Sequence, residues 1–122
     1  MPVKYRFDSN IVVIEMVGEY SMDDVRSAFL DSLADPERPI DSFLLINMTD
    51  SLSIKNRSTD EIRDMANFLA SLGERFENRI AMVAPDDFRY GLLRMGSFDS
   101  EQKGISSRVF RDFAQARNWL LS

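Results

Sequence analysis

The chain has no cysteine and no histidine among its 122 residues. Without cysteine it can form no disulfide and offers no thiol nucleophile. Without either residue it cannot build Cys/His zinc sites or His-dependent catalytic triads. The lack of cysteine suits a reducing compartment. The amino-terminal sequence lacks the apolar stretch of a signal peptide, and the apolar runs are too short to span a bilayer. We therefore expect a cytoplasmic protein with no integral membrane segment.

An excess of basic residues is also lacking. The chain has 20 acidic and 15 basic residues and a net charge of −5, which argues against nucleic acid as a partner. Beyond Pro85 the charges roughly balance, which predicts a mixed helical surface, with a basic patch for an acidic partner or lipid headgroup as the alternative. Hydrophobic residues make up 44% of the chain, enough to bury a core, and the length suits one domain over residues 1–122.

Five segments have the pattern of β-strands. Residues 3–7 alternate apolar and polar side chains, as a half-buried strand does, and residues 11–17 are rich in β-branched side chains. Residues 42–48 contain the continuous apolar run FLLI, which is typical of a central strand covered on both faces. The other two strands are expected at 79–84 and 106–110.

Four segments have a helical pattern, each preceded by residues that favour helix starts. The expected caps are Ser21 with Asp24, Ser58 with Glu61, Asp86 or Asp87, and Asp112 with Gln115. The apolar faces that follow are Met22, Val25, Phe29 and Leu33; Ile62, Met65, Ala66, Leu69 and Leu72; Phe88, Leu92, Met95 and Phe98; and Phe113, Ala116 and Leu120, with Trp119 beside them.

The order of elements is β-β-α-β-α-β-α-β-α, and it predicts an α/β fold. Strands that alternate with crossover helices pair in parallel, with helices on both faces of the sheet. The first strand is expected to be the exception, an antiparallel strand at one edge. The sequence therefore predicts a mostly parallel five-stranded sheet in a single domain.

Two stretches of the chain resemble a known family. They are RIAMVAPDDFRYG at residues 79–91 and VFRDFAQARNWL at residues 109–120. Together with the element order, they resemble the SpoIIAA-like family, small bacterial proteins related to STAS domains and to SEC14-type lipid-binding domains. The resemblance implies the fold and two functions, lipid binding or regulation of a partner protein. The phosphorylated Asp-Ser-Ser-Gly motif of the STAS antagonists is absent, since residues 55–60 read KNRSTD.

The third helix is the candidate ligand site. Gly91 and Gly96 lie inside it, and each costs about 1 kcal/mol relative to alanine. A helix weakened in this way would tilt off the sheet and open an apolar groove. The alternative is an ordinary core helix whose glycines allow close approach to a neighbour. The candidate ligand-binding residues are Phe88, Tyr90, Leu92, Met95 and Phe98.

A polar loop over residues 47–59 is the second candidate. It leaves the carboxyl end of the central strand, where ligands bind in open α/β sheets. A phosphate on Ser58 or Thr59 would lie at a helix amino terminus, which favours negative charge. The alternative is that Ser58 only caps the helix. The candidate partner or phosphorylation residues are Thr49, Asp50, Ser58 and Thr59.

No motif of the chain indicates catalysis, a bound metal or a cofactor, and we do not expect an enzyme. A set of Asp50, Asp86 and Arg89 around a polar pocket would be the exception. We expect a non-catalytic STAS/SEC14-like module that binds a small apolar ligand or lipid. The alternative is a partner-switching regulator acting through residues 49–59 and the start of the second helix. The sequence leaves a homodimer open.

Overall fold

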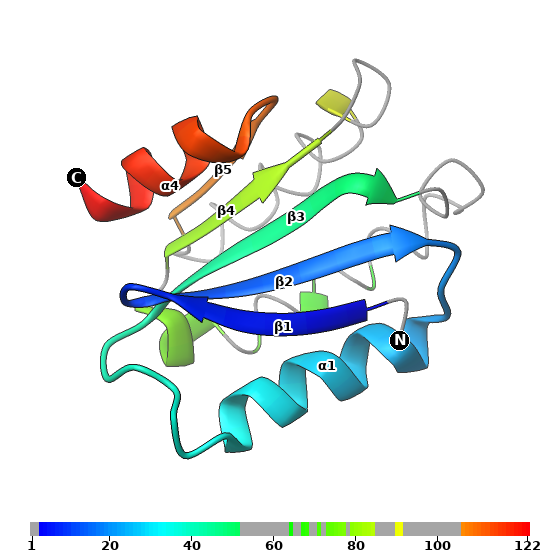
Figure 1. Ribbon diagram of the computed structural model, residues 1–122, viewed down its shortest axis with the longest axis horizontal. Coiled ribbons are helices and arrows are strands. Elements are labelled where there is room, and N and C mark those ends of the chain that lie inside the picture. The colour runs from blue at the N-terminus through cyan, green and yellow to red at the C-terminus, as the bar shows by residue number, and fades with distance from the viewer. Residues whose placement is uncertain are drawn as a thin grey trace.

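The computed structural model describes residues 3–51, 64, 67–68, 71, 73–77, 79–84, 90–91 and 106–122 (Figure 1). Within these residues the strands are β1 (Val3–Asp8), β2 (Ile11–Gly18), β3 (Phe43–Ser51), β4 (Arg79–Val83) and β5 (Ser106–Phe110). The helices with assigned bounds are α1 (Met22–Ala34), α4 (Phe113–Leu121) and the short 3-10 helix η2 (Gly73–Phe76).

The strands form one sheet in the order β1-β2-β3-β4-β5. Strand β1 pairs antiparallel with β2, and every other neighbouring pair is parallel. The predicted mostly parallel sheet with an antiparallel edge strand is therefore confirmed. Strand β3 lies in the middle, and its Leu44, Leu45 and Ile46 have no exposed surface, as the apolar run predicted.

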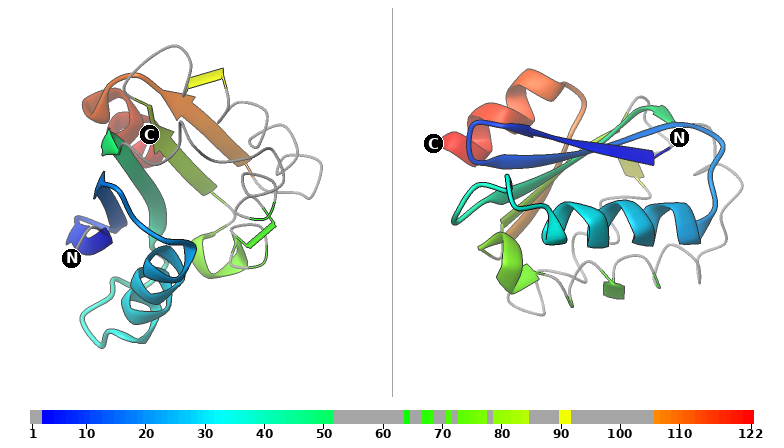
Figure 2. Two further views of the ribbon diagram at one scale, coloured as in Figure 1. Left: turned by 90° about the vertical axis from the view of Figure 1, so that its right-hand side faces the viewer. Right: turned by 60° about the horizontal axis from the view of Figure 1, so that its bottom comes forward.

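Helices cover the two faces of the sheet and divide the core in two. Because side chains alternate along a strand, Val12 and Ile14 of β2 face one side and Ile11 and Val13 face the other. The first side packs against α1 and the second against α4, and Figure 2 shows these two helices on opposite faces. The predicted arrangement of helices on both faces is confirmed.

Helix α1 begins at the predicted capping box. The Ser21 hydroxyl accepts a hydrogen bond from the Asp24 N–H at 3.1 Å, and the Asp24 carboxylate accepts one from the Ser21 N–H at 3.0 Å. Both bonds satisfy amide groups that the first helical turn would leave without partners. The buried stripe that follows consists of Val25, Ala28, Phe29 and Ser32.

Helix α4 begins after Asp112, as expected, but the prediction that the Asp112 side chain caps it is wrong. The Asp112 side chain makes no capping hydrogen bond. The helix is instead held by its tertiary contacts. Its Ala116 and Leu120 are buried against β3 and β4, and Phe113 and Trp119 pack partly buried beside them.

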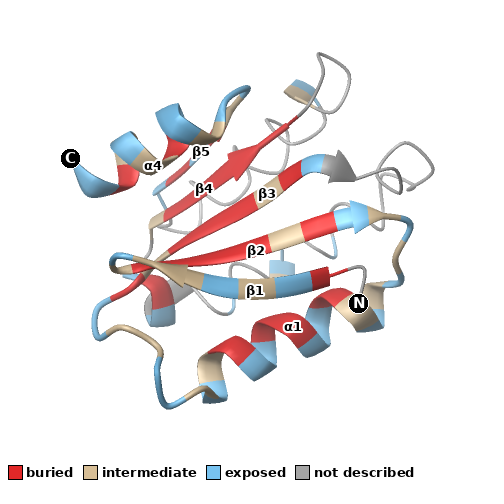
Figure 3. Cartoon of the chain, viewed as in Figure 1, coloured by how far each residue is buried: buried red, intermediate tan, exposed pale blue. Residues whose placement is uncertain are grey.

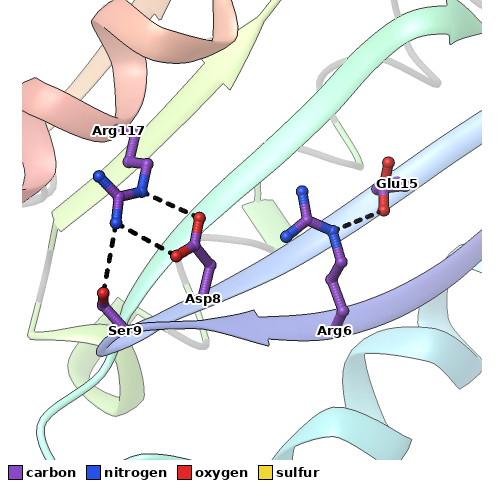
Figure 4. A network of polar contacts seen from close by, with 5 residues as sticks. All are labelled: Arg6, Asp8, Ser9, Glu15 and Arg117. Atoms are coloured by element: carbon purple, nitrogen blue, oxygen red, sulfur yellow. Dashed lines mark hydrogen bonds and ion pairs between the residues drawn. The ribbon is translucent and has the colours of Figure 1, made fainter.

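Two arginines fasten α4 to strands that are distant in the sequence. Arg117 donates to the Asp8 carboxylate at 2.9 and 3.3 Å and to the Ser9 hydroxyl at 3.3 Å, in the turn between β1 and β2 (Figure 4). From the first residue of β4, Arg79 donates to the Trp119 carbonyl. Its guanidinium carbon lies 4.5 Å from the centre of the Trp119 ring and 5.7 Å from that of Phe43. A cation at the carboxyl end of a helix is stabilised by the helix dipole.

Replacing Arg117 with methionine is expected to weaken the attachment of α4 to the β1–β2 turn. The change keeps the apolar stem but removes two charge-assisted hydrogen bonds, and the free energy of unfolding in urea should fall by about 1 kcal/mol. The control is Arg26→Met, since Arg26 lies on α1, pairs with Asp23 at 4.0 Å and is more exposed. It should cost less than about 0.5 kcal/mol. An equal loss in both variants would contradict a special role for the Arg117 contact.

Candidate functional site

The candidate site lies at the carboxyl edge of the parallel strands. Strand β2 ends there at Gly18 and β3 at Ser51, which pair with each other, and β4 ends at Val83. In open α/β sheets this edge is the usual place for binding, because the chain leaves the strands there in loops and helix starts. Figure 1 shows the arrowheads of β2 and β3 at this edge.

A β-bulge shapes the end of the central strand. Glu15 of β2 pairs with Asn47, but Val17 pairs with Asp50, so β3 carries one extra residue opposite Met16. The Asn47 side-chain oxygen accepts hydrogen bonds from the Thr49 N–H at 3.1 Å and from the Thr49 hydroxyl at 2.6 Å. By accepting the Thr49 N–H, the Asn47 side chain competes with the hydrogen bonding between strands. Bulges bend a strand and change the direction of its side chains.

The boundary between β3 and the polar loop differs from the expected one. Residues 47–51, predicted to begin the loop, belong to β3. Thr49 is exposed and Asp50 pairs with Val17 of β2, so these two candidate residues lie on the sheet itself. The other two, Ser58 and Thr59, lie outside the described residues.

Three methionines lie near the carboxyl ends of three neighbouring strands. Met16 of β2, Met48 of β3 and Met82 of β4 belong to the same core cluster and are 1%, 3% and 5% exposed. Met82 pairs with Ile46, two residues before Met48, and Met16 lies opposite the bulge. We call this group the methionine floor. Methionine side chains are flexible and polarizable, so such a floor can adapt its shape to a neighbouring apolar group.

Tyr90 lies against the same cluster. It is helical and half-buried, and it packs on the core that contains the methionine floor. Gly91, the next residue, is helical and exposed. Among the described residues, none comes within 4 Å of a Cβ atom added at Gly91, so none of them requires a glycine there. The other candidate ligand residues, Phe88, Leu92, Met95 and Phe98, lie outside the described residues, as does Gly96.

Sequence reasoning missed the methionine floor as a group. Each methionine belongs to a predicted strand, but the alignment of the three depends on the pairing of the strands. The signal present in the sequence is a methionine near the carboxyl end of three consecutive predicted strands. Counting positions back from the end of each predicted strand places Met16, Met48 and Met82 close to one edge of the sheet, and this count is enough to group them.

Among the described residues, Tyr5 and Asp35 have a clearly shifted pKa, and their contact lies at the opposite end of α1 from the capping box. The Tyr5 hydroxyl donates to the Asp35 carboxylate at 2.7 Å. This bond raises the pKa of Tyr5. The pKa of Asp35 is lowered, first by the hydrogen bond from the Glu37 N–H and then by that from Tyr5.

In the part of the chain that the structure describes, no group of three or more acidic side chains is arranged to hold a metal ion. Among the described helices, none is long and apolar enough to cross a membrane.

Comparison with known proteins relates the chain to one solved fold. No protein-family model matches it, and no curated protein matches it. It is similar to the crystal structure of an uncharacterized protein of the DUF3478 family with a SpoIIAA-like fold, from Shewanella loihica. The TM-score is 0.64 and the sequence identity 16%, over 97% of this chain and 91% of that one. The chain therefore has a SpoIIAA-like fold, as its sequence predicted, and at this identity the likeness concerns the fold alone.

Gly91→Ala is expected to stabilise the protein. Because the position is helical and open, alanine adds helix propensity without a clash, and the free energy of unfolding should rise by about 0.5–1 kcal/mol. The control is Gly18→Ala, which is equally free of neighbours but has a φ of +68°. Alanine is strained there, so that variant should be destabilised. Thermal unfolding of both variants tests this, and destabilisation by Gly91→Ala would show that the glycine serves the packing after all.

Proposed function

We propose that this protein, with its SpoIIAA-like fold, is a non-catalytic binding module. Its ligand is a small apolar molecule or lipid chain, held between the methionine floor and the helix that contains Tyr90. The observation that carries the proposal is the methionine floor itself, which sits at the carboxyl edge of β2, β3 and β4 and shares a core cluster with Tyr90.

The helix above this floor is a favourable place for a ligand to enter. Gly91 costs that helix about 1 kcal/mol relative to alanine, and no described residue lies close enough to it to require glycine. A helix of low local stability opens more readily than the strands beneath it. Tyr90 has an apolar ring and a polar hydroxyl, a combination suited to the rim of an apolar site. The sequence stripe Phe88, Leu92, Met95 and Phe98 would supply the rest of the apolar lining.

Titration with a fluorescent long-chain fatty acid tests this function. We expect saturable uptake of one molecule per chain, displaced by unlabelled fatty acid. Each additional buried methylene contributes about 0.8 kcal/mol, so affinity should rise about fourfold per carbon until the site is full. Met82→Phe would fill the floor and lower the affinity. Met22→Phe is the matched control, since Met22 lies at the start of α1 outside the core clusters. Folded wild-type protein that takes up no fatty acid would refute the proposal.

A partner-switching regulator is the second candidate, and the bulge in β3 favours it. The hydrogen bonds of Asn47 to Thr49 hold the bulge just before β3 ends at Ser51, and residues 52–59 follow directly in the sequence. A loop whose start is fixed in this way loses less freedom when it docks on a protein. Thr49 and Asp50 would lie at the beginning of that surface, and Ser58 and Thr59 at its end.

Capture of partners from the native host tests this second function. Asn47→Ala is expected to weaken the interaction, because it releases Thr49 and the bulge, whereas Asn118→Ala, on the exposed surface of α4, should leave it unchanged. Ser58→Asp and Ser58→Ala should differ in partner binding if phosphate at Ser58 is the switch. Equal binding by all four variants would exclude this surface as the docking site.

A further inference from the structure

The net charge of the protein is concentrated in one segment. Residues 19–41, which include α1 and the loop to β3, hold seven acids and two arginines, a net charge of −5. The rest of the chain holds 13 acidic and 13 basic residues and is neutral overall. This one segment of the chain therefore accounts for the whole acidic excess.

The two arginines of this segment are already engaged by the fold. Arg26 lies 4.0 Å from Asp23, and its guanidinium stands over the ring of Phe68 at 5.9 Å. Arg38 donates to the Arg75 carbonyl at 3.1 Å, at η2. Among the residues that the structure describes, no cation forms an ion pair with Asp31, Asp35 or Glu37. The negative charge at the carboxyl end of α1 is thus left uncompensated, although the helix dipole disfavours acids there.

Two large apolar side chains are exposed beside these acids. The exposed stripe of α1, opposite its buried stripe, would normally be polar. Leu30 lies within this exposed stripe and is 54% exposed, and Ile40 in the following loop is 89% exposed. Figure 3 shows the exposed side of α1 and the loop that follows it. A single exposed leucine is ordinary, but here two apolar side chains accompany the largest charge excess of the molecule.

The loop that presents Ile40 is held in a defined shape. The Asp35 carboxylate accepts hydrogen bonds from the Glu37 N–H at 2.9 Å and the Tyr5 hydroxyl at 2.7 Å. The Asp35 carbonyl accepts from the Arg38 N–H at 3.1 Å, and a proline stands on either side of the Glu37–Arg38 pair. The shape of the loop is therefore set before any partner arrives. A surface organised in advance loses little conformational freedom on binding.

We propose that Leu30, Asp31, Asp35, Glu37 and Ile40 form a docking surface, here called the acidic face, for a partner protein segment that carries basic side chains around an apolar one. The charge complementarity selects the partner, and Leu30 and Ile40 supply the apolar contact. The loop of this face leads into the amino end of β3, at the opposite edge of the sheet from the methionine floor. The acidic face therefore lies apart from the proposed ligand site.

A short synthetic peptide of lysine and leucine, with leucines at helical i, i+3, i+4 spacing, is the probe. In a titration followed by backbone amide NMR, we expect shift changes confined to residues 28–41 and affinity that falls as salt rises. Asp31→Asn with Glu37→Gln should weaken binding by about tenfold and Ile40→Ser by about fivefold. The matched charge control is Asp112→Asn with Asp64→Asn, two exposed acids outside residues 19–41, which should change affinity less than about twofold.

Three results would overturn the proposal. The first is the absence of binding, or shift changes spread over the surface. The second is an equal loss of affinity in the charge control, which would mean that net charge alone attracts the peptide. The third is a dimer in sedimentation analysis that Ile40→Ser converts to monomer, because the face would then be occupied by a second copy of the chain. A peptide with serine in place of leucine should bind more weakly than the probe. Equal binding would show that Leu30 and Ile40 supply no apolar contact.

Discussion

The pairing of β3 with strands on both of its edges is the constraint on which the rest of the structure depends. Leu44, Leu45 and Ile46 have polar backbone groups and no access to water, so those groups must bond to β2 and β4. Once this ladder forms, the alternation of side chains sends Leu44 and Ile46 to the α1 side and Leu45 to the α4 side. The two cores, and the helices that cover them, follow from one buried strand.

The same ladder separates two surfaces of different chemistry. At the carboxyl edge, the methionine floor meets the helix of Tyr90, and the proposed occupant is apolar. At the amino end of β3, the loop after α1 joins acids to Ile40, and the proposed occupant is basic. Both surfaces lie on the α1 side of the sheet but at opposite ends of its strands, and the buried residues of α1 belong to the same core cluster as the methionine floor. If a ligand bound at one surface changes the stability of the other, ligand binding changes the affinity of the module for its partner protein.

Local patterns in the sequence were sufficient for most of the fold. The β-branched run of β2, the FLLI run of β3 and the Ser21–Asp24 capping box each depend on a few neighbouring residues, and all three appear as predicted. The Asn47 bulge was missed because it depends on competition between an asparagine side chain and the ladder to β2. The methionine floor was missed because its three residues are grouped only when the ends of three separate strands are compared, and not by any one local pattern. Asp112 precedes α4 without capping it, because packing of Ala116 and Leu120 and the bonds of Arg79 and Arg117 hold that helix.

The bond between Arg117 and Asp8 spans 109 positions of the chain, and this separation matters during synthesis. Strands β1 to β4 leave the ribosome well before α4, and contacts so distant in sequence form late. Among the described helices, α4 is the one that covers the apolar side chains of Ile11, Val13 and Leu45, and it is absent until residues 113–121 have been made. The nascent sheet therefore passes through a stage in which one apolar face is open to other chains. The side of the sheet that packs on α4 is therefore covered later in synthesis than the contacts of α1 with the opposite side.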